Sequence, residues 1–296
     1  MTVAQLDEHR TFTIGGSDAA AACGVDPFRS PVMLWAEKSG RIEREPSEAM
    51  LWGQRLEPVI FGVLEAEGYE LLPAPADGFR SDKHPYMTGH PDAFVALDGE
   101  RALVSVKTTG QWAGHAWTNG SVPIAYQVQE LHYLALTGLN AALFACLIGG
   151  QRLEIRTMQR DDKAIARIIE LEAGFYEHLR SDTPPPASAN GDAALIYPEA
   201  KRELTRLTGE AWKHHRKLKM LAEQKRIIEA QYDAALEVEK ANIGDAATAL
   251  SPYDEVAARW TPYDRTALDS KALREAMPAT FTEFSTTKTL RRFTLE

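Results

Sequence analysis

Apolar positions follow two different periods along the N-terminal part of the chain. Apolar residues spaced three and four apart predict amphipathic helices over residues 47–67, 125–138 and 161–179. Continuous apolar runs between these helices predict strands at residues 93–97, 102–106, 141–148 and 153–158. Helices alternating with paired strands predict an α/β fold in which a mixed central sheet is flanked by helices.

The two middle strands are joined by Asp98-Gly99, a dipeptide that favours a two-residue hairpin turn. Pro91-Asp92 precedes the first of these strands, and Lys107 is expected to end the second. Such a hairpin places a carboxylate and an amine close together on adjacent strands. The carboxylate can bind a hard divalent cation, and the lysine can position a water for phosphodiester cleavage.

Two further stretches carry candidate chemistry. Ser17 and Asp18 open an alanine-rich run, which predicts a short helix with one of these two residues as its N-cap. A helix N-terminus with a hydroxyl, together with Arg10, suits a phosphate, although helix capping alone explains the same residues. Glu57 falls on the apolar side of the helix at 47–67, where the alternative interpretation is a solvated glutamate.

A Pro-rich segment separates two parts of different composition. Residues 183–200 begin with Thr-Pro-Pro-Pro and are predicted to be a linker. Residues 1–182 are expected to form the core, and residues 201–296 a helical C-terminal extension made of a long charged helix and a tail. The basic residues of that helix are explained by a solvated face or, alternatively, by contact with a DNA backbone.

The 296-residue chain carries a formal net charge of −9, so a surface for nucleic acid has to be a local patch. Cys23 and Cys146 lie far apart, which argues against a zinc site or a disulfide framework and favours a reducing compartment. The sequence lacks both a membrane-spanning apolar run and a signal-peptide core. We therefore expect a cytoplasmic protein without a membrane partner.

Several short motifs occur in the order found in a known group of nucleases. Pro91-Asp92 followed by Lys107 resembles the PD-(D/E)xK nuclease superfamily. The other motifs are Arg10, Gly16-Ser17, the run WGQRLE at 52–57, and a glutamine-bearing helix ending Leu136-Thr137-Gly138. As a set they resemble the YqaJ-type viral recombinases, which include the phage lambda-type alkaline exonuclease. The resemblance covers about residues 8–185.

This resemblance implies a restriction-endonuclease-like core and a defined activity. The implied activity is Mg²⁺-dependent 5′-to-3′ exonuclease digestion of double-stranded DNA ends in phage-type recombination, with Mn²⁺ as a substitute metal. The implied partners are a single-strand annealing protein and further copies of the chain in a ring. A phage-encoded member would act in the cytoplasm of the host bacterium.

The resemblance also implies roles for individual residues. Asp92 and Glu57 would be metal ligands, and the next metal-ligand position is occupied by Ser105. The other implied residues are Lys107, Glu57 and Gln129 in catalysis, with Gln127 as the second choice of glutamine, and Arg10 and Ser17 at the 5′-phosphate.

Ser105 is a departure from the family pattern, because a neutral hydroxyl replaces a carboxylate of the metal site. Three interpretations remain open. The first is a site that works with a weaker or single metal held by Asp92, Glu57 and a backbone carbonyl. The second is a site in which a carboxylate from elsewhere, such as Glu130, substitutes. The third is a catalytically impaired adaptor that binds DNA ends.

Overall fold

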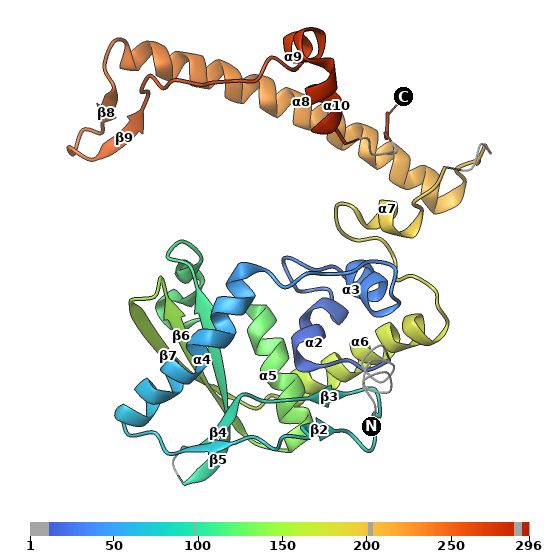
Figure 1. Cartoon of the computed structure of the whole chain (residues 1–296), viewed down its shortest axis with the longest axis vertical. Helices are drawn as coiled ribbons and strands as arrows, with labels where there is room; N and C mark the ends of the chain where they lie inside the picture. The colour runs from blue at the N-terminus through green and yellow to red at the C-terminus, as the bar shows by residue number, and fades with distance from the viewer. Residues whose placement is uncertain (1–11, 98, 201–203, 287–291, 296) are drawn as a thin grey trace. The chain divides into compact units, whose positions relative to one another are not determined.

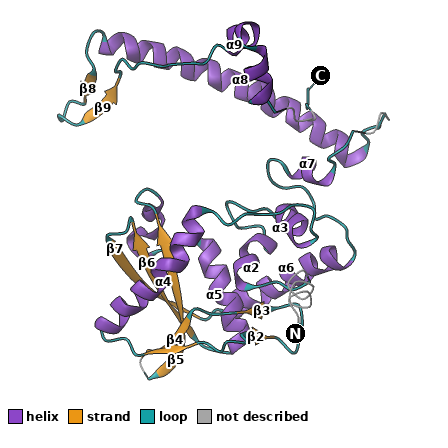
Figure 2. Cartoon of the chain, viewed as in Figure 1, coloured by secondary structure: helices purple, strands orange, loops and turns teal. Residues whose placement is uncertain are grey.

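The computed structural model of the chain describes residues 12–97, 99–200, 204–286 and 292–295 (Figure 1). The chain divides into two compact units, Met1–Pro198 and Glu199–Glu296. The first unit holds a five-stranded sheet with helices around it, and the second is built on one long helix (Figure 2). Within the described ranges, no helix is both long enough and apolar enough to cross a membrane.

The elements of the first unit follow one another as helices, strands, helices, strands and helices. Its helices are α2 (Gly16–Ala22), α3 (Pro31–Lys38), α4 (Glu48–Ala66), the 3-10 helix η1 (Ala113–Gly120), α5 (Ile124–Thr137), α6 (Asp162–Arg180) and α7 (Asp192–Ile196). Its strands are β1 (Leu71–Pro73), β2 (Phe79–Arg80), β3 (Thr88–Gly89), β4 (Ala93–Leu97), β5 (Glu100–Thr109), β6 (Ala141–Ile148) and β7 (Arg152–Gln159).

The main sheet has the strand order β1-β4-β5-β6-β7, while β2 and β3 pair with each other in a separate small sheet. Strands β5 and β6 run parallel, and the other neighbouring pairs of the main sheet run antiparallel. The mixed central sheet flanked by helices that the sequence predicts is therefore confirmed.

The hairpin of β4 and β5 lies in the middle of this sheet. Gly99 at its turn has a φ of 83°, a conformation that favours glycine, whereas Asp98 lies outside the described residues. Strand β5 continues to Thr109 because β6 pairs with it in parallel up to that residue. Lys107 consequently lies inside the strand, and the prediction that the strand ends there was wrong.

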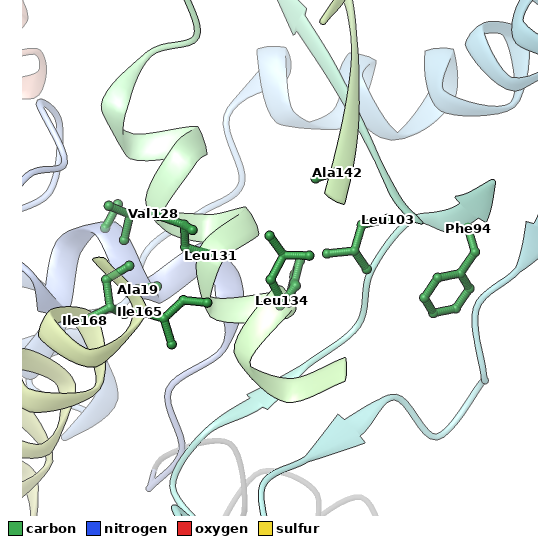
Figure 3. Packing of buried hydrophobic residues seen from close by; sticks show 11 residues of the cluster. Ala19, Phe94, Leu103, Val128, Leu131, Leu134, Ala142, Ile165 and Ile168 are labelled. Atoms are coloured by element: carbon green, nitrogen blue, oxygen red, sulfur yellow. The ribbon is translucent and has the colours of Figure 1, made fainter. Parts of the chain in front are cut away.

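Helices α4 and α5 cover opposite faces of β5. Leu103 packs with Leu134 and the other apolar residues of α5 (Figure 3). The next residue, Val104, packs with Ile60 and Leu64 of α4. Successive side chains of a strand point to opposite faces, so each helix meets a different set of β5 side chains. Full burial of one such side chain stabilises the fold by about 1.5–3 kcal/mol.

Helix α4 buries less of its apolar surface than its sequence predicts. Ser47 is its N-cap and accepts a hydrogen bond from Met50 N at 3.3 Å, so the predicted start is confirmed. Leu64 is fully buried, but Val59 and Val63 are exposed. The helix packs on the sheet along one stripe only, and its remaining apolar residues face away from the sheet.

A buried ion pair fixes α5 to its surroundings. His132 Nδ1 lies 2.7 Å from Glu172 Oε1 on α6, and His132 Nε2 lies 2.9 Å from the Thr88 carbonyl oxygen on β3. Both ring nitrogens face oxygens, so both must carry a proton to donate. Burial alone would lower the pKa of His132, but Glu172 and the Thr88 carbonyl raise it above its ordinary value.

The Pro-rich segment beyond α6 belongs to the first unit as far as Pro198. Asp192 at the start of α7 is buried, although it is a carboxylate. It accepts hydrogen bonds from Ser30 Oγ and from the backbone N atoms of Ser188 and Ala189. These contacts attach residues 188–192, part of the predicted linker, to the start of α3.

The second unit contains α8 (Gly209–Ile243), β8 (Thr248–Leu250), β9 (Val256–Arg259), α9 (Ser270–Ala276) and α10 (Pro278–Glu283). The long charged helix begins at Gly209 and not at 201 as predicted, and residues 201–203 lie outside the described ranges. None of the residues of α8 is buried. Exposed pairs such as Arg226 and Glu223, 2.6 Å apart, stabilise such a helix only weakly, because solvent screens them.

Candidate active site

Asp92 directly precedes β4 and is bonded to the neighbouring strand. Its Oδ2 atom accepts a hydrogen bond from the backbone N of Val106 at 2.7 Å. The antiparallel register pairs Ala93 with Val104, and one further step along it places Asp92 opposite Ser105. The hairpin therefore holds this carboxylate beside the middle of β5.

Ser105 and Lys107 are two residues apart on β5, so their side chains leave the same face of the strand. This face is the one that α5 covers. Lys107 Nζ lies 5.4 Å from the centre of the Tyr126 ring on α5, which is within the range of a cation–π contact. The amine is half-buried and is held between the strand and the helix.

Glu57 approaches the same region from α4, on the stripe of the helix that packs against the sheet. Burial and the negative charge of Asp92 raise the pKa of the Glu57 carboxyl above its ordinary value, while the positive charge of Lys107 lowers it. Charges act on the Glu57 carboxyl in this way only when they are near it. The structure thus brings together Asp92, Glu57 and Lys107, which come from a loop, a helix and a strand.

Glu130 on α5 is a further carboxylate of this site. It is 1% exposed, and burial raises its pKa to about 7, with Lys107 lowering and Asp92 raising the value. The Ser105 hydroxyl is near enough to lower this pKa as well, but its geometry falls short of a hydrogen bond. Within the described residues, Ser105 Oγ and both carboxylate oxygens of Glu130 lack a hydrogen-bond partner.

Sequence reasoning had offered Glu130 only as one alternative among three. A stronger signal was present, because Glu130 lies four residues before Leu134 on the apolar stripe of the predicted helix. A glutamate in such a stripe is rarely buried without a partner. Glu130 could therefore have been identified from its position on the apolar stripe of the helix, but not from its spacing to Lys107.

The side chains of this site suit a hard divalent cation. Asp92, Glu57 and Glu130 offer carboxylate oxygens, which are the ligands that Mg²⁺ prefers. A buried carboxylate without a partner is unfavourable, and a cation would compensate the charge of Glu130. Across the described part of the chain, no three Asp, Glu, His or Cys side chains already form a metal-binding cluster. Sharing one ion would therefore require small movements of these side chains.

The two candidate glutamines of α5 differ in their contacts. Gln127 Nε2 donates a hydrogen bond to the Val122 carbonyl oxygen at 2.6 Å, close to the start of the helix. Burial raises the pKa of the Tyr133 hydroxyl, and Gln129, which lies beside this hydroxyl, acts to lower the pKa. The charge of Asp92 also raises the pKa of Tyr133. Gln129 and Tyr133 therefore lie on the side of α5 that this charge reaches.

The start of α2 corrects the predicted capping. The N-cap is Gly15, whose backbone N donates to Asp18 Oδ2 at 3.2 Å, so neither Ser17 nor Asp18 is the N-cap. Asp18 also pairs with Arg29 at 2.6 Å and Lys38 at 2.8 Å. Burial would raise the pKa of Asp18, but these two cations hold it below its ordinary value. The Asp18 side chain thus connects the start of α2 to Arg29 and to Lys38 on α3.

Ser17 is exposed and lines a cavity of about 1020 Å³. Basic side chains such as Arg44 and acidic side chains such as Glu43 both contribute to its wall, and so does His90, two residues before Asp92. The cavity thus extends from the start of α2 toward the carboxylate site. Arg10, the other residue expected to bind a phosphate, lies outside the described residues.

The fold of the first unit is similar to that of solved structures named as exonucleases. An alkaline exonuclease from Laribacter hongkongensis, LHK-Exo, superposes with a TM-score of 0.50 at 18% identity, covering 61% of this chain and 94% of the other. The same enzyme solved in complex with dAMP matches equally well, with a TM-score of 0.50 and 18% identity. At this identity the likeness shows the fold.

Sequence comparison identifies the family more narrowly. Residues 6–140 match the YqaJ-like viral recombinase domain. The protein YqaJ of Bacillus subtilis (strain 168) is 26% identical over 290 residues, which cover 95% of this chain and 90% of the relative. The N-terminal part of the chain is thus similar to the YqaJ-like viral recombinase domain, and the resemblance drawn from its motifs is confirmed.

Proposed function

We propose that this protein is a Mg²⁺-dependent exonuclease that digests one strand from the ends of double-stranded DNA, in the 5′-to-3′ direction, during phage-type recombination. The observation that carries the proposal is the convergence of Asp92, Glu57 and Lys107 at the central hairpin of a nuclease fold. The structural neighbour's name, alkaline exonuclease, and its complex with dAMP support this reaction class.

Each side chain has a role that its chemistry suits. Asp92 and Glu57 would hold Mg²⁺, or Mn²⁺ in its place, through carboxylate oxygens. Bound Mg²⁺ supplies Lewis acidity, which neutralises phosphate charge and lowers the pKa of a coordinated water. Lys107 orients the attacking water and stabilises negative charge as it develops on the phosphate. Gln129 positions water or substrate from α5.

The 5′-to-3′ direction would come from the cavity at the start of α2. Ser17 lines this cavity, and together with Arg10 it would bind a terminal 5′-phosphate by hydrogen bonds and charge. The family resemblance further suggests a ring of several copies, a single-strand annealing protein as partner and, for a phage-encoded chain, the cytoplasm of a host bacterium.

A second candidate function is a catalytically impaired adaptor that binds DNA ends without cutting them. The observation that favours it is Ser105, a neutral residue at the position where a carboxylate is expected. Such an adaptor would keep the fold and the 5′-phosphate pocket, but it would bind Mg²⁺ too weakly for hydrolysis.

Digestion of linear duplex DNA distinguishes the two functions. The substrate carries a label on one strand, and its digestion is followed with Mg²⁺, with Mn²⁺ and with EDTA, beside a covalently closed circle as control. An exonuclease releases mononucleotides from the linear duplex only, and Lys107→Ala slows the release by about 10²–10⁴-fold. An intact duplex at high protein and Mn²⁺ concentrations, together with retained binding to DNA ends, identifies the adaptor.

A further inference from the structure

Two buried glutamates on the helices of the first unit show what a structural role requires. Glu172 is fully buried, and its Oε1 lies 2.7 Å from His132 Nδ1, so a cationic partner compensates its charge. Glu130 is equally buried, but neither of its oxygens has a hydrogen-bond partner within the described residues. A buried carboxylate without a partner costs several kcal/mol, and within the described residues neither a hydrogen bond nor an ion pair offsets this cost for Glu130.

The surroundings of Glu130 indicate what would compensate it. Tyr126 lies one turn earlier on the same helix, and its ring is 5.4 Å from Lys107 Nζ. Glu130 therefore faces the part of β5 that carries Ser105 and Lys107. Within the described residues, no salt bridge of 4.0 Å or less joins Glu130 to Lys107 or to any other cation. The lysine is near, but it does not pair with the carboxylate.

We infer that Glu130 is the carboxylate that takes the place of the missing acidic residue at Ser105, and that it binds the divalent cation together with Asp92. The metal site is then complete in charge, although its second acid comes from α5 and not from β5. This inference rests on the proposed function and assigns it a further metal-binding residue. It removes the reason for regarding the chain as an impaired adaptor.

Serine at position 105 fits this arrangement on steric grounds. Ser105 is 1% exposed and lies beside Asp92 and Glu130. A glutamate at 105 would bring another carboxylate into a space that Glu130 already occupies. The small side chain of Ser105 on the strand therefore leaves room for the long side chain of Glu130 on the helix.

The test measures binding of Mn²⁺ alone by calorimetry and thermal unfolding with Mn²⁺ or with EDTA. The variants are Glu130→Gln, Ser105→Glu, and Ser105→Glu combined with Glu130→Gln, which moves the acid from the helix to the strand. Glu170→Gln on α6 is the control, because Glu170 is exposed and pairs with Arg167. All variants are made in the full chain.

We expect Glu130→Gln to weaken Mn²⁺ binding by more than the roughly tenfold that the loss of a supporting group costs. In EDTA this variant should unfold at the same temperature as the parent or above it, since an uncompensated buried charge is removed. The double variant should recover most of the lost affinity. Ser105→Glu alone should unfold at a lower temperature in EDTA and regain stability with Mn²⁺. Glu170→Gln should bind Mn²⁺ as the parent does.

The opposite results would contradict either the role of Glu130 as a ligand or the proposed activity. Unchanged Mn²⁺ affinity in Glu130→Gln, or a lower unfolding temperature in EDTA, means that Glu130 is structural; the proposed exonuclease stands if the parent still digests DNA. A parent that binds Mn²⁺ through Glu130 but leaves DNA intact overturns the proposed activity and keeps the ligand assignment. A parent that does not bind Mn²⁺ refutes the ligand assignment directly.

Discussion

Replacing Glu172 by glutamine tests how α5 is held in place. Glu172 and His132 are both 0% exposed, and His132 also donates to the Thr88 carbonyl oxygen. Thr88 lies four residues before Asp92, so the network joins the helix that carries Glu130 to the segment that carries Asp92. Weakening the pair should therefore disturb both the stability of the first unit and the geometry of the site.

The magnitude follows from the burial of the pair. With glutamine at 172, His132 either keeps its charge without a counter-ion, or loses a proton and turns an unprotonated ring nitrogen toward an oxygen. Removing one partner of a buried pair costs about 3–5 kcal/mol, and the ability of His132 to deprotonate favours the lower end. At about 2–4 °C per kcal/mol for a unit of this size, a loss of about 3 kcal/mol lowers its Tm by about 6–12 °C.

The assay is thermal and urea unfolding of the full chain, followed by near-ultraviolet circular dichroism. Glu170→Gln on the same helix is the matched control, because Glu170 is exposed and pairs with Arg167 at 2.6 Å. An exposed pair contributes at most about 1 kcal/mol, so the control should shift Tm by only a few degrees. Equal shifts in the two variants would refute the argument that the buried pair anchors α5.

Four further results are expected. Lys107→Ala should lower the digestion rate by about 10²–10⁴-fold while leaving Mn²⁺ affinity and Tm near parental values; a parental rate would remove this lysine from the mechanism. Asp92→Asn should lose Mn²⁺ binding as well as activity, and calorimetry with unchanged affinity would contradict its role as a ligand. Duplexes with a 5′-phosphate should be digested faster than those with a 5′-hydroxyl, and Ser17→Ala should reduce the difference; equal rates in the parent would dismiss this pocket. Because the pKa of Asp18 is lowered in the fold, its contribution to stability is present above its unfolded pKa of about 3.9 and is lost as pH falls through the folded value; the Tm difference between the parent and Asp18→Asn should shrink with acid, and a pH-independent difference would refute this linkage.

The parts of the fold that the sequence predicts best are those set by local signals. The helix expected at 125–138 is observed as Ile124–Thr137, and Gly138 ends it with a φ of 72°. The strand expected at 141–148 is observed over those same residues. A continuous apolar run and a helix-ending glycine determine the structure of the few residues around them. The bounds of these elements therefore depend little on tertiary contacts.

The predictions that were wrong depend on contacts between distant parts of the chain. Lys107 lies inside β5 because β6, more than thirty residues later, extends the pairing. Gly15 caps α2 because Asp18 turns back to bind its backbone N and is itself held by Arg29 and Lys38. None of these contacts leaves a periodic pattern in the sequence.

The residues of the candidate site also differ in whether local sequence or tertiary packing places them. Asp92 and Lys107 are recognisable in the sequence because one hairpin carries both, and the spacing along a hairpin fixes which residues meet. Glu130 is not part of that spacing, because its distance from Lys107 is set by the packing of α5 on β5, through contacts such as Leu134 with Leu103. A motif that counts residues between an acid and a lysine cannot detect an acid supplied by a helix. A metal ion responds to every charged side chain around it, whichever strand or helix carries that side chain. A neutral residue at one motif position is therefore not enough to show that the site is inactive.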